Sequence, residues 1–137
     1  MIPIGECTII KPVTCTPDEK IVSAVKKLKK QQLRHLYVVD KKKNLLGVFS
    51  GLDLVYNVLA AEKDYRQLTV KACMKTDIVS FAREDPLTKA IGFMSHTSVF
   101  SCPILEKGKL IGVLSYKDAM AAVLKQKQLF QQKQQIR

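Results

Sequence analysis

A serine followed three residues later by an aspartate occurs twice in this chain, each time after a short apolar stretch. The two stretches read GVFSGLD at residues 47–53 and GVLSYKD at residues 112–118. Each places a hydroxyl and a carboxylate at the start of an expected helix, where the first backbone N–H groups lack partners within the helix. This pattern suits two kinds of chemistry, a structural helix cap and a binding site for a small ligand.

The structural interpretation is a capping box, in which Ser50 caps the helix and the Asp53 side chain bonds back to the backbone. For one copy alone this interpretation is favoured, because such short patterns often occur without a ligand. The ligand interpretation uses the same geometry. N–H groups at a helix start suit a phosphate, and a carboxylate there can accept both hydroxyls of a ribose. Both interpretations hold if a ligand competes for the caps.

The two stretches lie within a longer repeat. Shifted by 66 residues, TPDEKIVSAVKKL (16–28) falls on AREDPLTKAIGFM (82–94), and LRHLYVVD (33–40) falls on VFSCPILE (99–106). The first pair has apolar residues at i, i+3, i+4 and i+7, which predicts one buried helix face in each copy. These residues are Ile21, Ala24, Val25 and Leu28, and Leu87, Ala90, Ile91 and Met94. The second pair is short, β-branched and apolar, which predicts buried strands.

The repeat continues through polar turns at KKKN (41–44) and KGK (107–109) to LLGVFSGLD (45–53) and LIGVLSYKD (110–118). Each copy therefore predicts strand, helix, strand, turn, strand and helix. One copy of about 60 residues would have a marginal core, so we expect the two copies to pack face to face about a pseudo-twofold axis.

The charge of the chain is strongly basic, with a formal net charge of +11. Residues 20–43 carry nine Lys or Arg against one acid, Asp40. Such a surface favours polyanions, and the alternative is a solvated face that keeps the protein in solution. Nucleic-acid binding through this lysine-rich surface is therefore an alternative function.

The four cysteines form no C-x-x-C pair and only two histidines are present, so we expect no metal site and reduced, mostly buried thiols. No activated nucleophile is visible, which argues against an enzyme. No apolar run approaches about 18 residues and the N-terminus does not match a signal peptide, so we expect a cytoplasmic protein without membrane contact.

Four stretches resemble the cystathionine-β-synthase-type (CBS) motif, and the pair of copies resembles a Bateman module. They are IIKPVTCTPDEKI, LRHLYVVDKKKNLLGVFSGLDL, CMKTDIVSFAREDPL and CPILEKGKLIGVLSYKDAM. The resemblance implies an α/β (α+β) fold of two CBS motifs, at residues 1–65 and 66–124, before a basic Gln-rich helix or tail at 125–137. It also implies a regulatory sensor without catalysis, a homodimer and a regulated target protein. The implied ligands are AMP, ADP, ATP or S-adenosylmethionine, bound in clefts between the motifs.

Carried over by position, the resemblance implies two composite sites. The first joins Ser50 and Asp53 to Asp77, Val79 and Val99, and the second joins Ser115, Lys117 and Asp118 to Thr8, Lys11, Val13 and Leu33. Asp77 can accept a hydrogen bond from the adenine amino group, whereas its counterpart Lys11 cannot. Lys117 is placed for a phosphate, and the first copy has Leu52 at that position.

Arg34 and His35 match the basic pair that faces phosphates in the kinase gamma subunits of this family, whereas the second copy has Phe100 and Ser101 there. An ordinary strand histidine bonded to a backbone carbonyl remains the alternative for His35. Residues 60–72 predict a helix end and a surface linker. The tail at 124–137 predicts a continuation of the last helix, with Leu124, Phe130 and Ile136 as its apolar residues.

Overall fold

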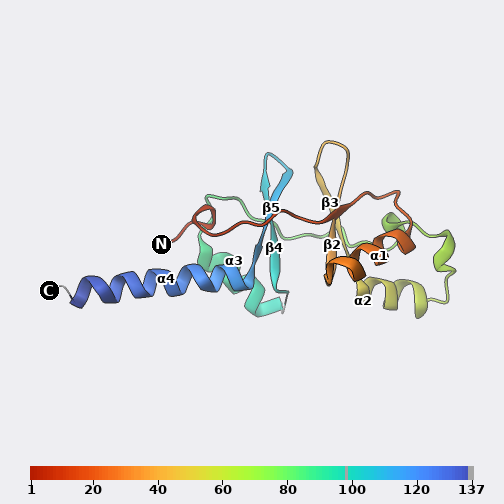
Figure 1. Ribbon diagram of the computed structural model, residues 1–137. Helices are drawn as coiled ribbons and strands as arrows, with labels where there is room; N and C mark the ends of the chain where they lie inside the picture. Colours follow the sequence, from red (N-terminus) through yellow and green to blue (C-terminus); the bar gives the residue numbers. More distant parts are fainter. Residues whose placement is uncertain (98, 136–137) are drawn as a thin grey trace. The chain divides into compact units, whose positions relative to one another are not determined.

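The computed structural model describes residues 1–97 and 99–135 and consists of two compact units (Figure 1). The first-copy unit comprises residues 12–79 and 107–110, and the second-copy unit comprises residues 1–11, 80–106 and 111–137. Residues 1–11, which precede the first copy, thus belong to the second-copy unit. The residues up to 79, which precede the second copy, belong to the first-copy unit. Ile136, which we expected in the tail helix, lies outside the described residues.

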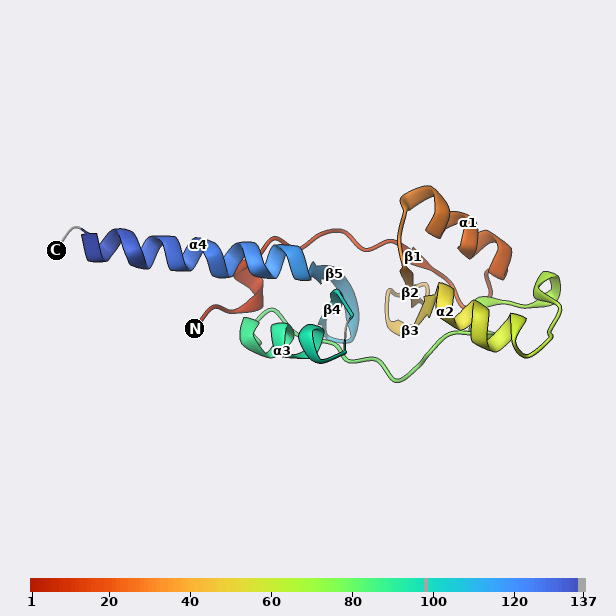
Figure 2. The same ribbon diagram turned by 90° about the horizontal axis from the view of Figure 1, so that it is seen from below.

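The first-copy unit is a three-stranded sheet with helices on one face, as both views show (Figures 1 and 2). Its elements are β1 (Thr14–Cys15), α1 (Ile21–Gln31), β2 (His35–Val39), β3 (Leu45–Ser50), α2 (Gly51–Leu54), the π-helical turn η2 (Val55–Leu59), and the 3-10 turns η3 (Tyr65–Gln67) and η4 (Val70–Ala72). The central strand β2 runs parallel to β1 and antiparallel to β3. Because β3 leads directly into α2, the sheet fixes the position of Ser50.

The second-copy unit repeats this order around a two-stranded sheet. Its elements are the 3-10 turn η1 (Ile4–Glu6), α3 (Leu87–Thr97), β4 (Ser101–Glu106), β5 (Lys109–Ser115) and α4 (Tyr116–Gln135). The first two residues of β5 are grouped with the first-copy unit. Beyond Ala122, every described residue of α4 is exposed, so the tail up to Gln135 continues the helix without packing against its own unit.

The predicted first strand of the second copy is reduced to one parallel bridge between Phe81 and Ile104. In the first copy, the Tyr37 N–H donates to the Val13 carbonyl and extends the ladder. The residue at the position of Tyr37 in the second copy is Pro103, which has no N–H to donate. The strand prediction was therefore wrong there, and the proline gives the physical reason.

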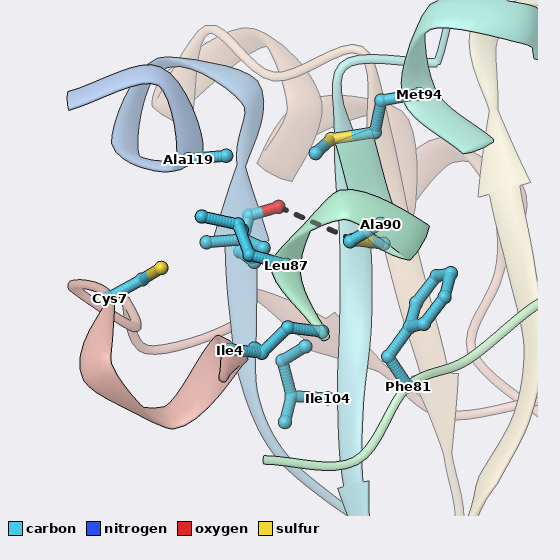
Figure 3. Close-up of a cluster of buried hydrophobic side chains, with 10 residues drawn as sticks. Ile4, Cys7, Phe81, Leu87, Ala90, Met94, Ile104 and Ala119 are labelled. Carbon is cyan, nitrogen blue, oxygen red and sulfur yellow. Dashed lines mark hydrogen bonds between the residues drawn. The ribbon is translucent and has the colours of Figure 1, made fainter. Parts of the chain in front are cut away.

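Each unit has its own hydrophobic core, and the predicted helix faces form part of both. Ile21, Ala24 and Leu28 pack in the first, and Leu87, Ala90 and Met94 in the second (Figure 3). All four cysteines are free and buried, as predicted. The α/β fold class with two copies of one motif is confirmed.

The expectation of a surface linker at residues 60–72 was wrong for its second half. Val70 is 0% exposed and belongs to the core of the first-copy unit. Its N–H donates to the Glu19 carbonyl at 2.9 Å, and the Ile21 N–H donates to the Leu68 carbonyl at 3.1 Å. The sequence conceals this because a single buried valine between polar residues has no periodicity. In residues 1–97 and 99–135, no helix has the length and apolar character needed to cross a membrane.

Candidate functional site

Ser50 and Asp53 form the predicted capping box at the end of β3. The Asp53 N–H donates to Ser50 Oγ at 3.3 Å, while the Ser50 N–H and hydroxyl donate to Asp53 Oδ2 at 2.9 and 3.0 Å. Asp53 is 2% exposed, and it is the one charged side chain that is buried among the described residues. A buried carboxylate is costly without partners, and these hydrogen bonds supply partners for it.

Ser115 and Asp118 repeat this arrangement in the second-copy unit. The Asp118 N–H donates to Ser115 Oγ at 3.0 Å, and the Ser115 hydroxyl donates to Asp118 Oδ2 at 2.9 Å. Both residues are half-buried, and the neighbouring Lys117 is exposed. The two Ser/Asp pairs therefore share both hydrogen bonds of the serine hydroxyl, as the repeat predicted, whereas the bond from the Ser50 N–H to Asp53 is a feature of the first pair.

A backbone bridge next to each pair adds a segment from elsewhere in the chain. Val48 and Lys75 exchange two backbone hydrogen bonds of 2.9 Å, and Val113 and Ile10 exchange bonds of 2.9 and 3.0 Å. The glycine before each valine makes this approach possible. A Cβ on Gly47 would lie 2.7 Å from the Lys75 carbonyl oxygen, and one on Gly112 would overlap the side chain of Ile9.

The bridges determine which predicted residues share a unit. Asp77 and Val79 lie on the segment after Lys75, in the unit of Ser50 and Asp53, and both are exposed. Thr8 and Lys11 flank Ile10 in the unit of Ser115 and Asp118, and both are exposed. Val99 belongs to the second-copy unit, whereas Val13 and Leu33 belong to the first-copy unit. The composite grouping across the units remains a prediction.

The segment between the bridge and the following strand position is one residue longer in the second copy than in the first, which affects the match between Asp77 and Lys11. Lys75 corresponds to Ile10 by its bridge, but Phe81 corresponds to Cys15 by its pairing with the neighbouring strand. Lys75 and Phe81 are six positions apart, whereas Ile10 and Cys15 are five positions apart. Counting back from Phe81 and Cys15, Asp77 corresponds to Lys11. Counting forward from the bridge residues Lys75 and Ile10, Asp77 corresponds to Pro12.

Lys75 is a residue that the sequence reasoning missed. Its ammonium Nζ lies 3.9 Å from Asp53 Oδ1, and its side chain is 66% exposed. The sequence holds one clue, since Lys75 stands two residues before Asp77 in CMKTDIVS. No periodicity links it to Asp53, because the contact depends on the bridge to Val48.

Arg34 and His35 lie next to the Ser50 cap. The Gly51 N–H donates to the Arg34 carbonyl at 3.4 Å, and His35 stands opposite Ser50 in the β2–β3 ladder. His35 Nε2 lies 3.2 Å from the Tyr37 hydroxyl, with the two rings nearly perpendicular at 89°. Burial lowers the pKa of His35, which favours the neutral imidazole. Arg34, which is exposed, is therefore the better phosphate ligand of the two.

Two hollows lie beside α1, and neither is lined by the residues of a Ser/Asp pair. One of about 500 Å³ is lined by Lys20, Val22, Ser23, Lys26, Lys27 and Lys30. The other, of about 420 Å³, is lined by Thr14, Cys15, Thr16, Asp18, Glu19 and Lys27. Neither contains a predicted site residue. We place the candidate site at the Ser/Asp pairs, because they carry the paired hydroxyl and carboxylate groups.

Comparison with known proteins gives relatives of different lengths. An uncharacterized protein of Methanopyrus kandleri is 22% identical over 118 residues, which are 85% of this chain and 60% of that protein. The inosine-5'-monophosphate dehydrogenase of Aquifex aeolicus is 26% identical over 111 residues, 80% of this chain but 22% of the enzyme. This chain thus spans less than two thirds of both relatives.

Solved structures agree with the fold. CBSX2, solved in complex with AMP, matches with a TM-score of 0.77 at 22% identity, covering 93% of this chain and 99% of that one. A CBS domain pair solved with 5-methylthioadenosine and S-adenosyl-L-methionine matches with a TM-score of 0.73 at 20% identity, covering 93% and 98%. At these identities the likeness shows the fold alone. The CBS domain model matches residues 4–60 and 70–125, and the chain therefore belongs to the CBS domain family, as a tandem pair of CBS domains.

Proposed function

We propose that this chain is a regulatory module that binds an adenine nucleotide or another adenosyl ligand without catalysing a reaction. The observation that carries the proposal is the recurrence of a serine hydroxyl bonded to both the N–H and the carboxylate of an aspartate, at the end of the last strand in both units. Family membership supports it, since two matching structures were solved with AMP and with S-adenosyl-L-methionine.

The proposed chemistry uses the two carboxylates as acceptors for ribose hydroxyls. Each carboxylate oxygen has more than one acceptor position, so Asp53 and Asp118 can keep a cap bond and still bind a hydroxyl. Asp77 is the proposed acceptor for the adenine amino group, and Arg34 and Lys117 are the proposed phosphate ligands. The regulated target and the homodimer are part of the same proposal, which rests on the family resemblance for both.

Thermal unfolding with added ligand tests the proposal. A ligand that binds only the folded state stabilises it by about 2.7 kcal/mol at one hundred times its Kd, which corresponds to roughly 10 °C for a chain of this size. We expect AMP, ADP, ATP or S-adenosylmethionine at millimolar concentration to raise Tm, and GMP to raise it less.

The double variant Asp53→Asn/Asp118→Asn is the matched control. Ser50 and Ser115 still cap their helices, and the asparagine side-chain oxygen can still accept from the serine hydroxyl, so the variant should fold. It lacks the carboxylates and should lose the ligand-induced rise in Tm. An unchanged Tm of the wild-type chain with all four adenosyl compounds would contradict the proposed function.

A second candidate function rests on the hollow beside α1. Lys20, Lys26 and Lys30 line it and are exposed, whereas Lys27 pairs with Glu19 at 3.0 Å and also donates to the Thr14 carbonyl. A row of exposed cations on one helix surface favours a polyanion such as single-stranded nucleic acid.

Fluorescence anisotropy with a labelled single-stranded oligonucleotide distinguishes this candidate. Binding through lysines weakens steeply as the salt concentration rises. The triple variant Lys20→Gln/Lys26→Gln/Lys30→Gln should weaken binding more than Lys125→Gln/Lys127→Gln/Lys133→Gln, which removes the same charge from α4. Equal losses in the two triple variants would show that net charge, and not the α1 surface, drives binding.

A further inference from the structure

The Asp53 carboxylate has different partners on its two oxygens. Oδ2 accepts hydrogen bonds from the Ser50 N–H and hydroxyl. Oδ1 faces the ammonium of Lys75 at 3.9 Å. The Asp53 side chain is 3% exposed and that of Lys75 is 66% exposed. A largely exposed cation therefore lies between a buried carboxylate and the solvent.

The backbone, and not the ion pair, holds Lys75 in this place. Its N–H and carbonyl both bond to Val48, which stands two residues before Ser50 on β3. Gly47 allows the close approach, because its missing Cβ leaves room for the Lys75 carbonyl and the Met74 side chain. The Cα of Lys75 thus stays beside Asp53 whatever its ammonium contacts.

The ion pair itself is weak enough to be exchanged. A charge-assisted N–H···O bond is about 2.7–2.9 Å long, so 3.9 Å is a looser contact. A largely exposed lysine in such a pair has little to lose when its ammonium moves to another anion. The flexible four-carbon side chain of lysine allows that movement.

The second-copy unit has no cation at the equivalent place. Ile10 makes the same bridge to Val113 that Lys75 makes to Val48. Asp118 therefore has an isoleucine where Asp53 has a lysine. The exposed cation nearest to it in sequence is Lys117, on the helix itself.

We propose that Lys75 is a specificity-determining residue for a phosphorylated nucleoside at Asp53. The Asp53 carboxylate accepts the ribose hydroxyls, and the Lys75 ammonium turns from Asp53 to a phosphate of the same ligand. Without Lys75 the negative carboxylate would repel that phosphate, whereas an uncharged nucleoside gains nothing from the lysine. The inference rests on the proposed function and deepens it.

Equilibrium binding of AMP and of adenosine tests this inference. The measurements use the full chain with Asp118→Asn, which keeps an acceptor for the Ser115 hydroxyl and leaves Asp53 as the site that is measured. In this background Lys75→Gln should weaken AMP binding roughly tenfold or more and change adenosine binding by less than about twofold. Lys71→Gln, which removes an exposed lysine from η4 in the same unit, should change neither.

Three outcomes would contradict the inference in distinguishable ways. Equal AMP affinity with and without Lys75 would overturn it and leave the proposed function standing. An equal loss of affinity for AMP and for adenosine would show that Lys75 shapes the site and does not bind the phosphate. A chain that binds neither compound, even without substitutions, would overturn the proposed function and the inference with it. Thermal unfolding of Lys75→Gln without ligand checks that the variant folds, and Lys75→Arg should retain most of the preference for AMP.

Discussion

Ser50 and Asp53 bond to each other in both directions, with the Asp53 N–H donating to Ser50 Oγ at 3.3 Å and the Ser50 N–H donating to Asp53 Oδ2 at 2.9 Å. A ligand that uses the Asp53 carboxylate must share these contacts or displace them. Stability and binding at this residue are therefore linked. Comparing substitutions that keep the cap with substitutions that remove it separates the effect on stability from the effect on binding.

The first prediction concerns the cap. Asp53→Ala should lower the free energy of unfolding by about 0.5–2 kcal/mol, because the Ser50 N–H loses its acceptor, while Asp53→Asn should cost less. Urea denaturation measures both. Asp64→Ala is the control, since Asp64 caps η3 by accepting from the Arg66 N–H at 3.0 Å but lies outside the proposed site. An Asp53→Ala variant as stable as the wild type would contradict the structural role.

The second prediction concerns the glycine that admits Lys75. Gly47→Ala should destabilise the fold by roughly 1–3 kcal/mol, because the new Cβ would lie 2.7 Å from the Lys75 carbonyl and the Met74 sulfur. Gly51→Ala is the matched control, since apart from the adjoining chain and the backbone of its own helix no atom lies within 4 Å of its Cβ position. Denaturation midpoints compare the two variants, and equal midpoints would rule out the close approach.

The third prediction concerns pH. Burial lowers the pKa of His35 in the folded chain, below an unfolded value of about 6.5. The unfolded chain therefore takes up the proton first as the pH falls, so this contribution to stability is present above about pH 6.5 and is lost below it. His35→Gln should lose less stability than the wild type between about pH 7.5 and pH 5. Urea denaturation at both values measures this, and an equal loss in both proteins would contradict it.

The fourth prediction concerns the thiols. Burial raises the pKa of Cys15 to about 11 and that of Cys102 to about 12. Since the thiolate is the reactive form, both should resist iodoacetamide at about pH 8 until the protein unfolds. Peptide mass spectrometry with and without urea identifies the labelled residues, and fast labelling of Cys102 in the folded protein would disprove its burial.

The sequence predicted the repeat, the helix faces and the capping pairs, because each rests on local spacing that survives in any fold of this class. Lys75 next to Asp53 and Val70 in the core were not predicted. Both depend on contacts between segments far apart along the chain, and neither residue belongs to a periodic pattern. Pro103 lies between these two cases. The repeat predicted a first strand in the second copy, and the missing N–H of Pro103, which the sequence shows, reduces the pairing of that strand.

The central claim is that Asp53 and Asp118 bind the ribose of an adenosyl ligand. Calorimetric titration of AMP into the wild type, Asp53→Asn/Asp118→Asn and Asp64→Ala tests it most directly. We expect the wild type and Asp64→Ala to bind AMP with the same affinity, and the double variant to lose at least tenfold in affinity while it still unfolds cooperatively. Unchanged AMP binding by the folded double variant would contradict the claim and leave the two Ser/Asp pairs as helix caps alone.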